Sequence, residues 1–324
     1  MTMTSPLPIP LPLAEVPPDT VWRRMRQSGR IVIGGGILLV MLLVCVGSLP
    51  WTAFENADGS LPAMHYDRQD PTQAVQPPSA AMPLWFGTDK LGRSLLGRCL
   101  VGGAISLFIG LAAAAISVVV GVTVGLIAGY RGGWIDALLM RSVDVLFALP
   151  YVLMVILIKV GFEDHFARWF GDRYVANLVV LFVAIGSVSW LTMARVIRGQ
   201  VLSLRAQPFI EACRAGGLRE WRIFTRHLLP NLVGPITVYA TLIVPQAILQ
   251  ESFLSFLGIG IQAPLPTWGS LASDGLLPAL NPIDPDWWLL LFPCVLLAVT
   301  LLSLNFVGDG LRDLFDPKRE AAKI

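Results

Sequence analysis

The feature that most constrains this chain is a series of apolar segments, each close to twenty residues long and nearly free of charged side chains. A helix of about 20 apolar residues crosses the hydrocarbon core of a bilayer. The sequence therefore predicts an all-α integral membrane protein with six transmembrane helices, at 31–50, 102–129, 143–158, 177–194, 232–258 and 287–307.

Composition supports the same class. Of the 324 residues, 55% are hydrophobic and 14% are charged, whereas a soluble domain carries about 25% charged residues. These values exclude disordered, fibrous and ordinary soluble proteins. The net charge of +2 gives no indication of nucleic-acid binding, and the four cysteines and three histidines lack the spacing of a disulfide framework or a metal site.

Arginine and lysine residues indicate which helix ends face the cytoplasm. They concentrate in the leader 1–30, between the fourth and fifth apolar segments, and in the tail 311–324, whereas the connection between the fifth and sixth segments contains none. Six spans place these basic regions on one side, which the positive-inside rule assigns to the cytoplasm. Both termini are therefore expected in the cytoplasm, and 51–98 and 159–176 are expected as extracytoplasmic loops.

The first apolar segment raises the alternative of a cleaved signal peptide. A proline-rich leader of some thirty residues precedes it, and no clear small-x-small cleavage site follows. Both features favour an uncleaved first helix.

Small residues recur at every fourth position of the second apolar segment. Such a stripe lets helix backbones approach closely in lipid, although glycine and alanine are also common in membrane helices generally. We favour a packing face, without a partner assigned to it, formed by Ala113, Ser117, Gly121, Gly125 and Gly129.

The cytoplasmic loop 203–230 is too charged to enter lipid and is predicted to form two short helices. Gly216-Gly217 would separate them, because glycine adopts the backbone conformations that end a helix. Pro230 is expected to mark a boundary before the fifth span. Basic amphipathic helices of this kind either lie on anionic headgroups or dock into another protein.

A family resemblance begins in this loop. Glu211-Ala212-Cys213, Gly217 and Leu229-Pro230 fit the spacing of E-A-A, three residues, G, nine residues, then I-x-L-P, and so resemble the EAA loop of ABC-importer permeases. Cys213 replaces the second alanine of that pattern, and His227 replaces its isoleucine. The resemblance extends over about 86–317 and includes four further motifs, at 86–93, 130–136, 251–260 and 266–269. These motifs resemble those of the C-type permeases of dipeptide and oligopeptide ABC importers and occur in the same order. Ser94 departs from the aspartate usual after Gly-Arg in the first of these motifs.

The resemblance implies a type I ABC importer permease fold with its core at 99–310. It implies a non-catalytic subunit, without cofactor or metal, that forms half of a peptide translocation pathway in the bacterial inner (cytoplasmic) membrane. The implied partners are a second, B-type permease, two ABC ATPase subunits that bind the ATP, and an extracytoplasmic peptide-binding protein. By the same resemblance, Glu211, Ala212, Cys213, Gly217, Leu229 and Pro230 belong to the ATPase-coupling loop.

Other cargoes and other classes stay open at this point. Related permeases carry nickel, glutathione or antimicrobial peptides, so the cargo is open. A stand-alone secondary transporter, a channel or a membrane enzyme has weaker support, because the spans hold few charges and no catalytic motif. Gln246, Gln250 and Glu251 in the fifth span are candidates to line the pathway. The alternative for Glu251 is a structural hydrogen bond to a neighbouring helix.

One motif is a false lead. The segment 87–94 resembles a phosphate-binding loop, G-x4-G-K-[ST], with arginine in place of lysine. A phosphate loop needs a preceding buried strand and cytoplasmic nucleotide. The preceding residues make a poor strand and the topology places the segment outside, so we do not expect nucleotide to bind there.

Overall fold

The computed structural model describes residues 18–315 except 57 and 83. The proline-rich part of the predicted leader and the end of the tail, 316–324, lie outside the described residues. The described part is built of helices, in the order Pro18–Gln27 (α1), Gly29–Gly47 (α2), Leu49–Thr52 (α3), Pro71–Gln73 (η1), Leu95–Arg131 (α4), Gly133–Ala148 (α5), Tyr151–Phe170 (α6), Arg173–Arg205 (α7), Pro208–Ala215 (α8), Glu220–Ile223 (α9), Phe224–Leu228 (η2), Leu229–Phe256 (α10), Trp268–Ala279 (α11) and Trp287–Phe315 (α12).

Five helices are long and apolar enough to cross a membrane: α2, α4, α7, the run Glu220–Phe256 and α12. The pair α5 and α6 forms a sixth candidate span that is bent by 95°. The predicted all-α membrane fold is therefore observed, and the sixth span is present when the bent pair is counted as one.

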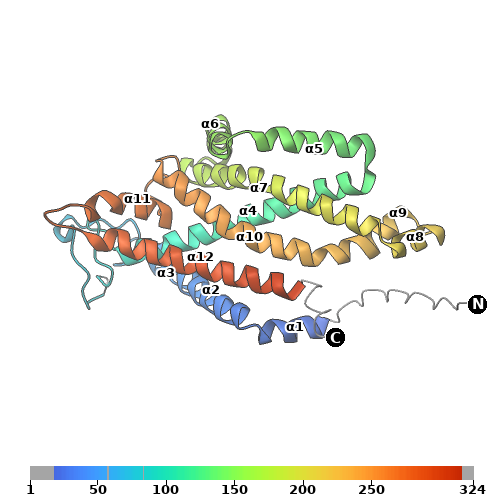
Figure 1. Cartoon of the computed structure of the whole chain (residues 1–324). Coiled ribbons are helices and arrows are strands. Elements are labelled where there is room, and N and C mark those ends of the chain that lie inside the picture. The colour runs from blue at the N-terminus through green and yellow to red at the C-terminus, as the bar shows by residue number, and fades with distance from the viewer. Residues whose placement is uncertain (1–17, 57, 83, 316–324) are drawn as a thin grey trace, which may run out of the picture.

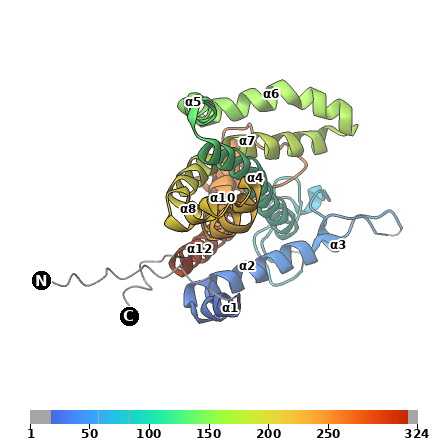
Figure 2. The same cartoon turned by 90° about the vertical axis from the view of Figure 1, so that its right-hand side faces the viewer.

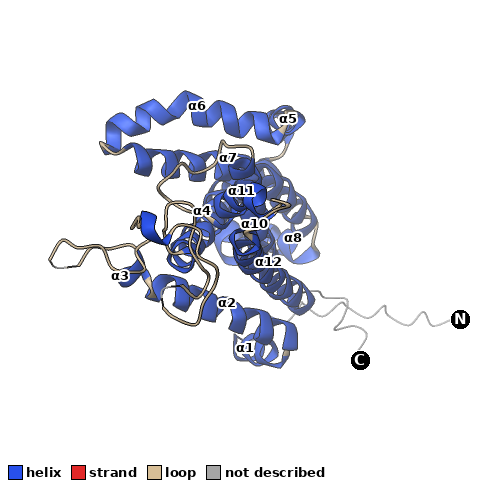
Figure 3. Ribbon diagram, turned by 90° about the vertical axis from the view of Figure 1, so that its left-hand side faces the viewer, coloured by secondary structure: helices blue, strands red, loops and turns tan. Residues whose placement is uncertain are grey.

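The long helices run side by side along one axis (Figure 1). Helices α4, α7, α10 and α12 form the centre; α2 packs against α12 and α4 on one side, and α5 and α6 lie beyond α7 on the other (Figure 2). Figure 3 views the bundle from the end that holds α11 and the loop before α4. Helices α8 and α9 lie at the opposite end (Figure 1), so the two connections assigned by the sequence to opposite membrane faces are separated by the length of the bundle.

The small-residue stripe of α4 packs against α7. A Cβ atom added at Gly121 would lie 2.6 Å from Cβ of Met193, and one added at Gly125 would lie 2.6 Å from the carbonyl oxygen of Ala194. Only glycine lets the backbones of α4 and α7 approach this closely. Close packing holds helices together in a membrane, because lipid is as apolar as the side chains and gives no hydrophobic driving force. The predicted packing face is confirmed, and its partner is a helix of the same chain.

The structure differs from the single span predicted at 143–158. Helix α5 ends at Ala148, and Leu149 has an extended backbone (φ −77°, ψ 140°) before Pro150. Proline disfavours the helical conformation of the residue before it and lacks an N–H for the helical ladder. The chain therefore turns at Leu149-Pro150, and α6 makes the stretch expected as an external loop helical as far as Phe170.

Pro230 is the second residue of α10, so the predicted boundary falls at the start of that helix, although the helical run itself continues from Glu220 to Phe256. The turn before the proline is a π-helix (η2), in which the N–H of Leu229 bonds to the carbonyl of Phe224 five residues earlier. A π turn is wider than an α turn, and we infer that it accommodates a residue that has no N–H to donate. The loop is thereby joined rigidly to α10.

Candidate functional site

The segment predicted to couple to an ATPase forms a compact turn between α8 and α9. Helix α8 ends in a Schellman motif: the N–H of Leu218 bonds to the carbonyl of Cys213 at 3.1 Å, and the N–H of Gly217 bonds to that of Arg214 at 3.0 Å. Gly217 has φ +72°, a left-handed conformation that costs other residues roughly 1–2 kcal/mol. The glycine of the EAA-like pattern is therefore explained by the backbone of the helix end.

The same segment has a small hydrophobic core of its own. Ile210, Ile223 and Leu228 are fully buried, and Cys213 and Leu218 pack against them. Because these side chains come from α8, α9 and η2, the three short elements are held as one body. An element with its own core can transmit motion without unfolding.

This body is tied to two spanning helices through Tyr130 at the end of α4. The hydroxyl of Tyr130 donates to the carbonyl of Glu220 at 3.3 Å, and its ring packs edge-on against Phe224 at 5.8 Å. Arg205 at the end of α7 donates to the carbonyl of Tyr130 at 2.9 Å. Leu204 of α7 also packs against the local core, so the coupling segment contacts α4 and α7 directly, in addition to its continuation into α10.

The predicted coupling residues differ in their exposure. Glu211 and Ala212 lie exposed on the outer face of α8, and Gly217 is exposed at the turn. Cys213 is half-buried in the local core, so its replacement of alanine falls on the inner face. Leu229 and Pro230 lie within the continuous helix.

Two ion pairs join α5 to α7. Asp136 comes from the 130–136 motif, and its carboxylate accepts both the Nε–H and Nη2–H of Arg198, the latter at 2.7 Å. Asp144 accepts a further hydrogen bond from Arg195 at 2.8 Å. Asp136 of the motif after the second span thus anchors α5 to α7.

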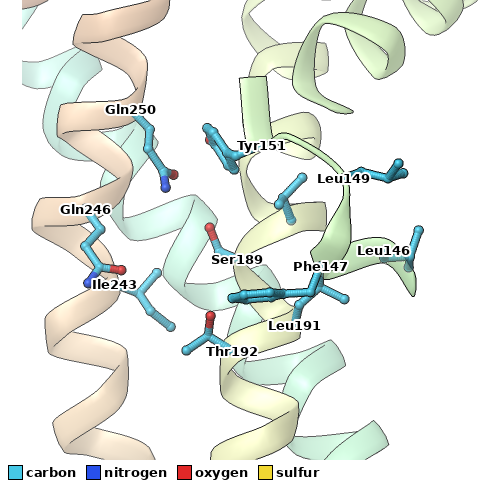
Figure 4. Close-up of a pocket in the computed structure, with 11 residues that line it drawn as sticks. Leu146, Phe147, Leu149, Tyr151, Ser189, Leu191, Thr192, Ile243, Gln246 and Gln250 are labelled. Atoms are coloured by element: carbon cyan, nitrogen blue, oxygen red, sulfur yellow. The ribbon is translucent and has the colours of Figure 1, made fainter. Parts of the chain in front are cut away.

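A cavity of about 290 Å³ opens between α5, α6, α7 and α10. Gln246 and Gln250 point into it from α10, toward Ser189 and Thr192 of α7 (Figure 4). Tyr151, the first residue of α6, completes the polar side, and Phe147 and Leu146 of α5 are apolar neighbours. The amide oxygen of Gln250 and the hydroxyl of Tyr151 are buried without a hydrogen-bond partner in the described chain.

Sequence reasoning found the two glutamines and missed Tyr151, Ser189 and Thr192. The spacing of Gln246 and Gln250 places them one turn apart on the same helix face, which is visible in the sequence. The other three residues come from distant helices, and isolated serine, threonine or tyrosine residues in a membrane helix give no local signal. The break at Leu149-Pro150, which brings Tyr151 to the cavity, was the one signal that the sequence offered.

Glu251, the third predicted pathway residue, does not line this cavity. It is fully buried, and its Oε1 accepts hydrogen bonds from Ser255 at 2.6 Å and from Thr267 at 2.8 Å. Thr267 also caps the N-terminus of α11. Glu251 is not among the residues that line the cavity, and its contacts tie α10 to α11 at the outer end of the bundle.

These contacts predict a difference between two substitutions of Glu251. Replacement by alanine leaves the buried hydroxyls of Ser255 and Thr267 without their acceptor, which is expected to cost about 2–3 kcal/mol of stability. Replacement by glutamine keeps an oxygen at the Oε1 position and is expected to retain most of the stability. Thermal unfolding of the purified variants measures both. If the two variants have equal melting temperatures, the bracing role of Glu251 is wrong.

The motif at 86–93 is a structural clasp. The carboxylate of Asp89 accepts the N–H groups of Leu91 and Arg93, the Nε–H of Arg93 at 2.8 Å, and an N–H of the buried Arg98 at 2.7 Å. A Cβ at Gly92 would lie 1.8 Å from the carbonyl oxygen of Asp70. The backbone N–H groups of Asp89, Leu91, Gly92 and Arg93 are all bonded within the motif.

Three comparisons place the chain among known proteins. The family described as binding-protein-dependent transport system inner membrane component matches residues 121–321. The oligopeptide transport system permease protein OppC of Escherichia coli is 43% identical over 94% of this chain and 93% of its own length. The dipeptide transport system permease protein DppC of Bacillus subtilis is 40% identical over 92% of this chain and 84% of its own length.

The fold is also found in solved structures. An inward-facing crystal structure of the MetNI methionine ABC transporter has a chain that is 18% identical, with a TM-score of 0.52 over 68% of this chain and 97% of that chain. At this identity the similarity establishes the fold alone, and the fold is that of an ABC importer permease. The family match over residues 121–321 and the relatives at 40–43% identity show that the chain, with its several spans, is a multi-pass membrane subunit that belongs to the binding-protein-dependent transport system inner membrane components, within the group of OppC and DppC permeases.

Proposed function

We propose that this chain is the C-type permease subunit of an ATP-driven importer of dipeptides or oligopeptides. It forms half of the translocation pathway and receives the motion of an ATPase through the body made by α8, α9 and η2. The observation that carries the proposal is this body: it has its own core, an exposed outer face with Glu211 and Ala212, and direct contacts to α4, α7 and α10. A motor that moves α8 would therefore move three spanning helices together.

The cavity in Figure 4 supports the proposed role in the translocation pathway. Its polar side consists of amides and hydroxyls, with no charged residue among those that line it. Amides and hydroxyls both donate and accept hydrogen bonds, so they can bind peptide groups whatever the side chains of the cargo. Gln246 and Gln250 are proposed as pathway residues on this basis. The names of the OppC and DppC relatives support peptides as the cargo class.

The proposed assembly contains a second, B-type permease, two ABC ATPase subunits and an extracytoplasmic peptide-binding protein, in the bacterial cytoplasmic membrane. ATP hydrolysis belongs to the ATPase subunits. The end of the bundle with α8 and α9 would face the cytoplasm, and the end with α11 and the clasp at 86–93 would face the binding protein.

Reconstitution tests the proposed function. The chain is co-purified with its neighbouring-gene permease, ATPases and binding protein, placed in liposomes, and supplied with labelled peptide outside and ATP inside. ATP-dependent uptake of dipeptides or oligopeptides is expected, and none from liposomes that hold this chain alone. Nickel and glutathione serve as competing cargoes. Uptake driven by an ion gradient through this chain alone would contradict the proposal and favour a secondary transporter.

A further inference from the structure

A second cavity, of about 640 Å³, lies beside the coupling body and is separate from the one in Figure 4. It is lined by the end of α4, the end of α7 and residues of α8, α9 and η2. Neither the family match nor the EAA-like pattern assigns a role to this space.

The cavity carries an excess of positive charge. Arg131, Arg205 and Arg214 line it, and Glu220 is the one acidic residue among its lining residues. Arg214 lies 3.3 Å from the carboxylate of Glu220, and Arg205 uses one N–H for the carbonyl of Tyr130. Each guanidinium has five N–H donors in a planar fork, so most of the donors in this cavity are left for an anionic ligand.

The other side of the cavity is apolar and continuous with a spanning helix. Leu126 and Ile127 lie one turn before Arg131 on α4, and Ile127 is 45% exposed. Trp221, which is 73% exposed, stacks on Phe224 at 5.6 Å beside the arginines. Exposed tryptophan is typical of the level of lipid headgroups. The cavity therefore combines apolar residues of a spanning helix, an exposed tryptophan and three arginines, which are the residue types that contact acyl chain, interface and phosphate of a lipid.

We propose that this cavity binds an anionic phospholipid, with the phosphate among Arg131, Arg205 and Arg214 and an acyl chain along Leu126 and Ile127. Basic pockets between helices on the cytoplasmic side of a membrane favour such headgroups. A bound phosphate would bridge α4, α7 and α8, and so would hold the coupling body against the spanning helices. The effect on coupling depends on the proposed function above, whereas the binding itself does not.

Lipid retention by the full chain tests the binding directly. The purified chain is placed in nanodiscs of phosphatidylcholine with a fraction of phosphatidylglycerol, extracted, and analysed for retained lipid by native mass spectrometry. The wild type is expected to retain phosphatidylglycerol in preference to phosphatidylcholine. The double variant Arg131→Gln with Arg214→Gln is expected to retain roughly 10- to 30-fold less, given about 1 kcal/mol for each arginine near the surface.

Two matched variants and one competitor make the result specific. Arg226→Gln removes the same charge from an exposed residue of η2 that does not line the cavity, and it is expected to retain lipid as the wild type does. Arg131→Lys with Arg214→Lys keeps the charge and is expected to restore most of the retention. Inorganic phosphate is not expected to displace the lipid, because it lacks the acyl chain.

Equal retention by the wild type and the Gln double variant would overturn the proposal, as would equal retention of the two lipids by the wild type. A second pair of results would also overturn it. In this case the double variant retains phosphatidylglycerol as the wild type does, but no longer co-purifies with the ATPase subunits in nanodiscs of phosphatidylcholine alone. The arginines would then bind an acidic surface of the ATPase. Circular dichroism and melting temperature of the double variant show whether a loss of retention comes from unfolding. Failure of peptide uptake in the complete transporter would leave these binding results intact, so the two proposals can fail separately.

Discussion

Replacing Gly125 by leucine is expected to prevent α4 and α7 from packing. A Cβ at this position would lie 2.6 Å from the carbonyl oxygen of Ala194, 2.9 Å from Cβ of Ile197 and 3.1 Å from the backbone nitrogen of Arg198. Two of these three atoms belong to the backbone of α7 and cannot rotate away. The leucine side chain would therefore have to push the helices apart along the stripe that contains Gly121 and Gly129. We expect the free energy of unfolding to fall by at least about 3 kcal/mol, the upper end of the cost of overpacking a core.

The measurement is the amount and the melting temperature of folded protein after purification in mild detergent. Gly36→Leu is the matched control, since Gly36 lies in the spanning helix α2 and a Cβ there would meet no atom within 4 Å. The control is expected to fold as the wild type does. Normal folding of the Gly125→Leu variant would mean that α4 and α7 do not pack as the structure has them.

Reversing the charge of Glu211 is expected to abolish ATP-driven uptake while the permease remains folded. Glu211 is exposed on α8, and the core of the coupling body is formed by other side chains, Ile210 among them. Within the chain, Glu211→Lys places a cation in the first turn of a helix, and this unfavourable interaction lowers the stability by only about 0.3–1 kcal/mol. At an interface with an ATPase, disruption of a buried charge contact costs about 2–5 kcal/mol, equivalent to a roughly 30-fold or greater loss of association.

Association is measured by co-purification of the ATPase subunits with the tagged permease, and transport by peptide uptake in liposomes. Glu55→Lys is the matched control, because Glu55 is also exposed but lies in the loop after α3, outside the coupling body. It is expected to leave ATPase association unchanged. If Glu211→Lys keeps both association and uptake, the coupling assignment of α8 is wrong.

The EAA-like loop shows how far local sequence carries a prediction. The pattern located a helix end at Gly217, and the structure supplies the reason, a left-handed residue in a Schellman motif. The pattern did not reveal that the helical run continues into α10, because the π turn before Pro230 depends on a bond between Phe224 and Leu229 that no residue type specifies. Which face of α8 is exposed also followed only from the packing of Ile210 on α9 and η2.

Polar contacts between helices could not be predicted from the sequence, for a different reason. Glu251 was recognised as unusual because a carboxylate in an apolar span is rare, but its partner Thr267 lies beyond the end of the same helix, in the cap of α11. Asp136 pairs with Arg198 from another helix, 62 positions away. Neither pair has a spacing that could be distinguished from chance.

The sequence by itself determined the membrane class, the order of the five continuous spans, the distribution of basic residues between the two ends, and the family. These properties depend on the length and charge of local segments, and a bilayer selects for both directly. The tertiary structure decided which helices touch, how sharply the chain bends after Ala148, and which polar side chains share a cavity. In lipid the outward and inward faces of a helix are equally apolar, so hydrophobic periodicity does not mark the buried face, and only the close approach of backbones such as those of α4 and α7 does.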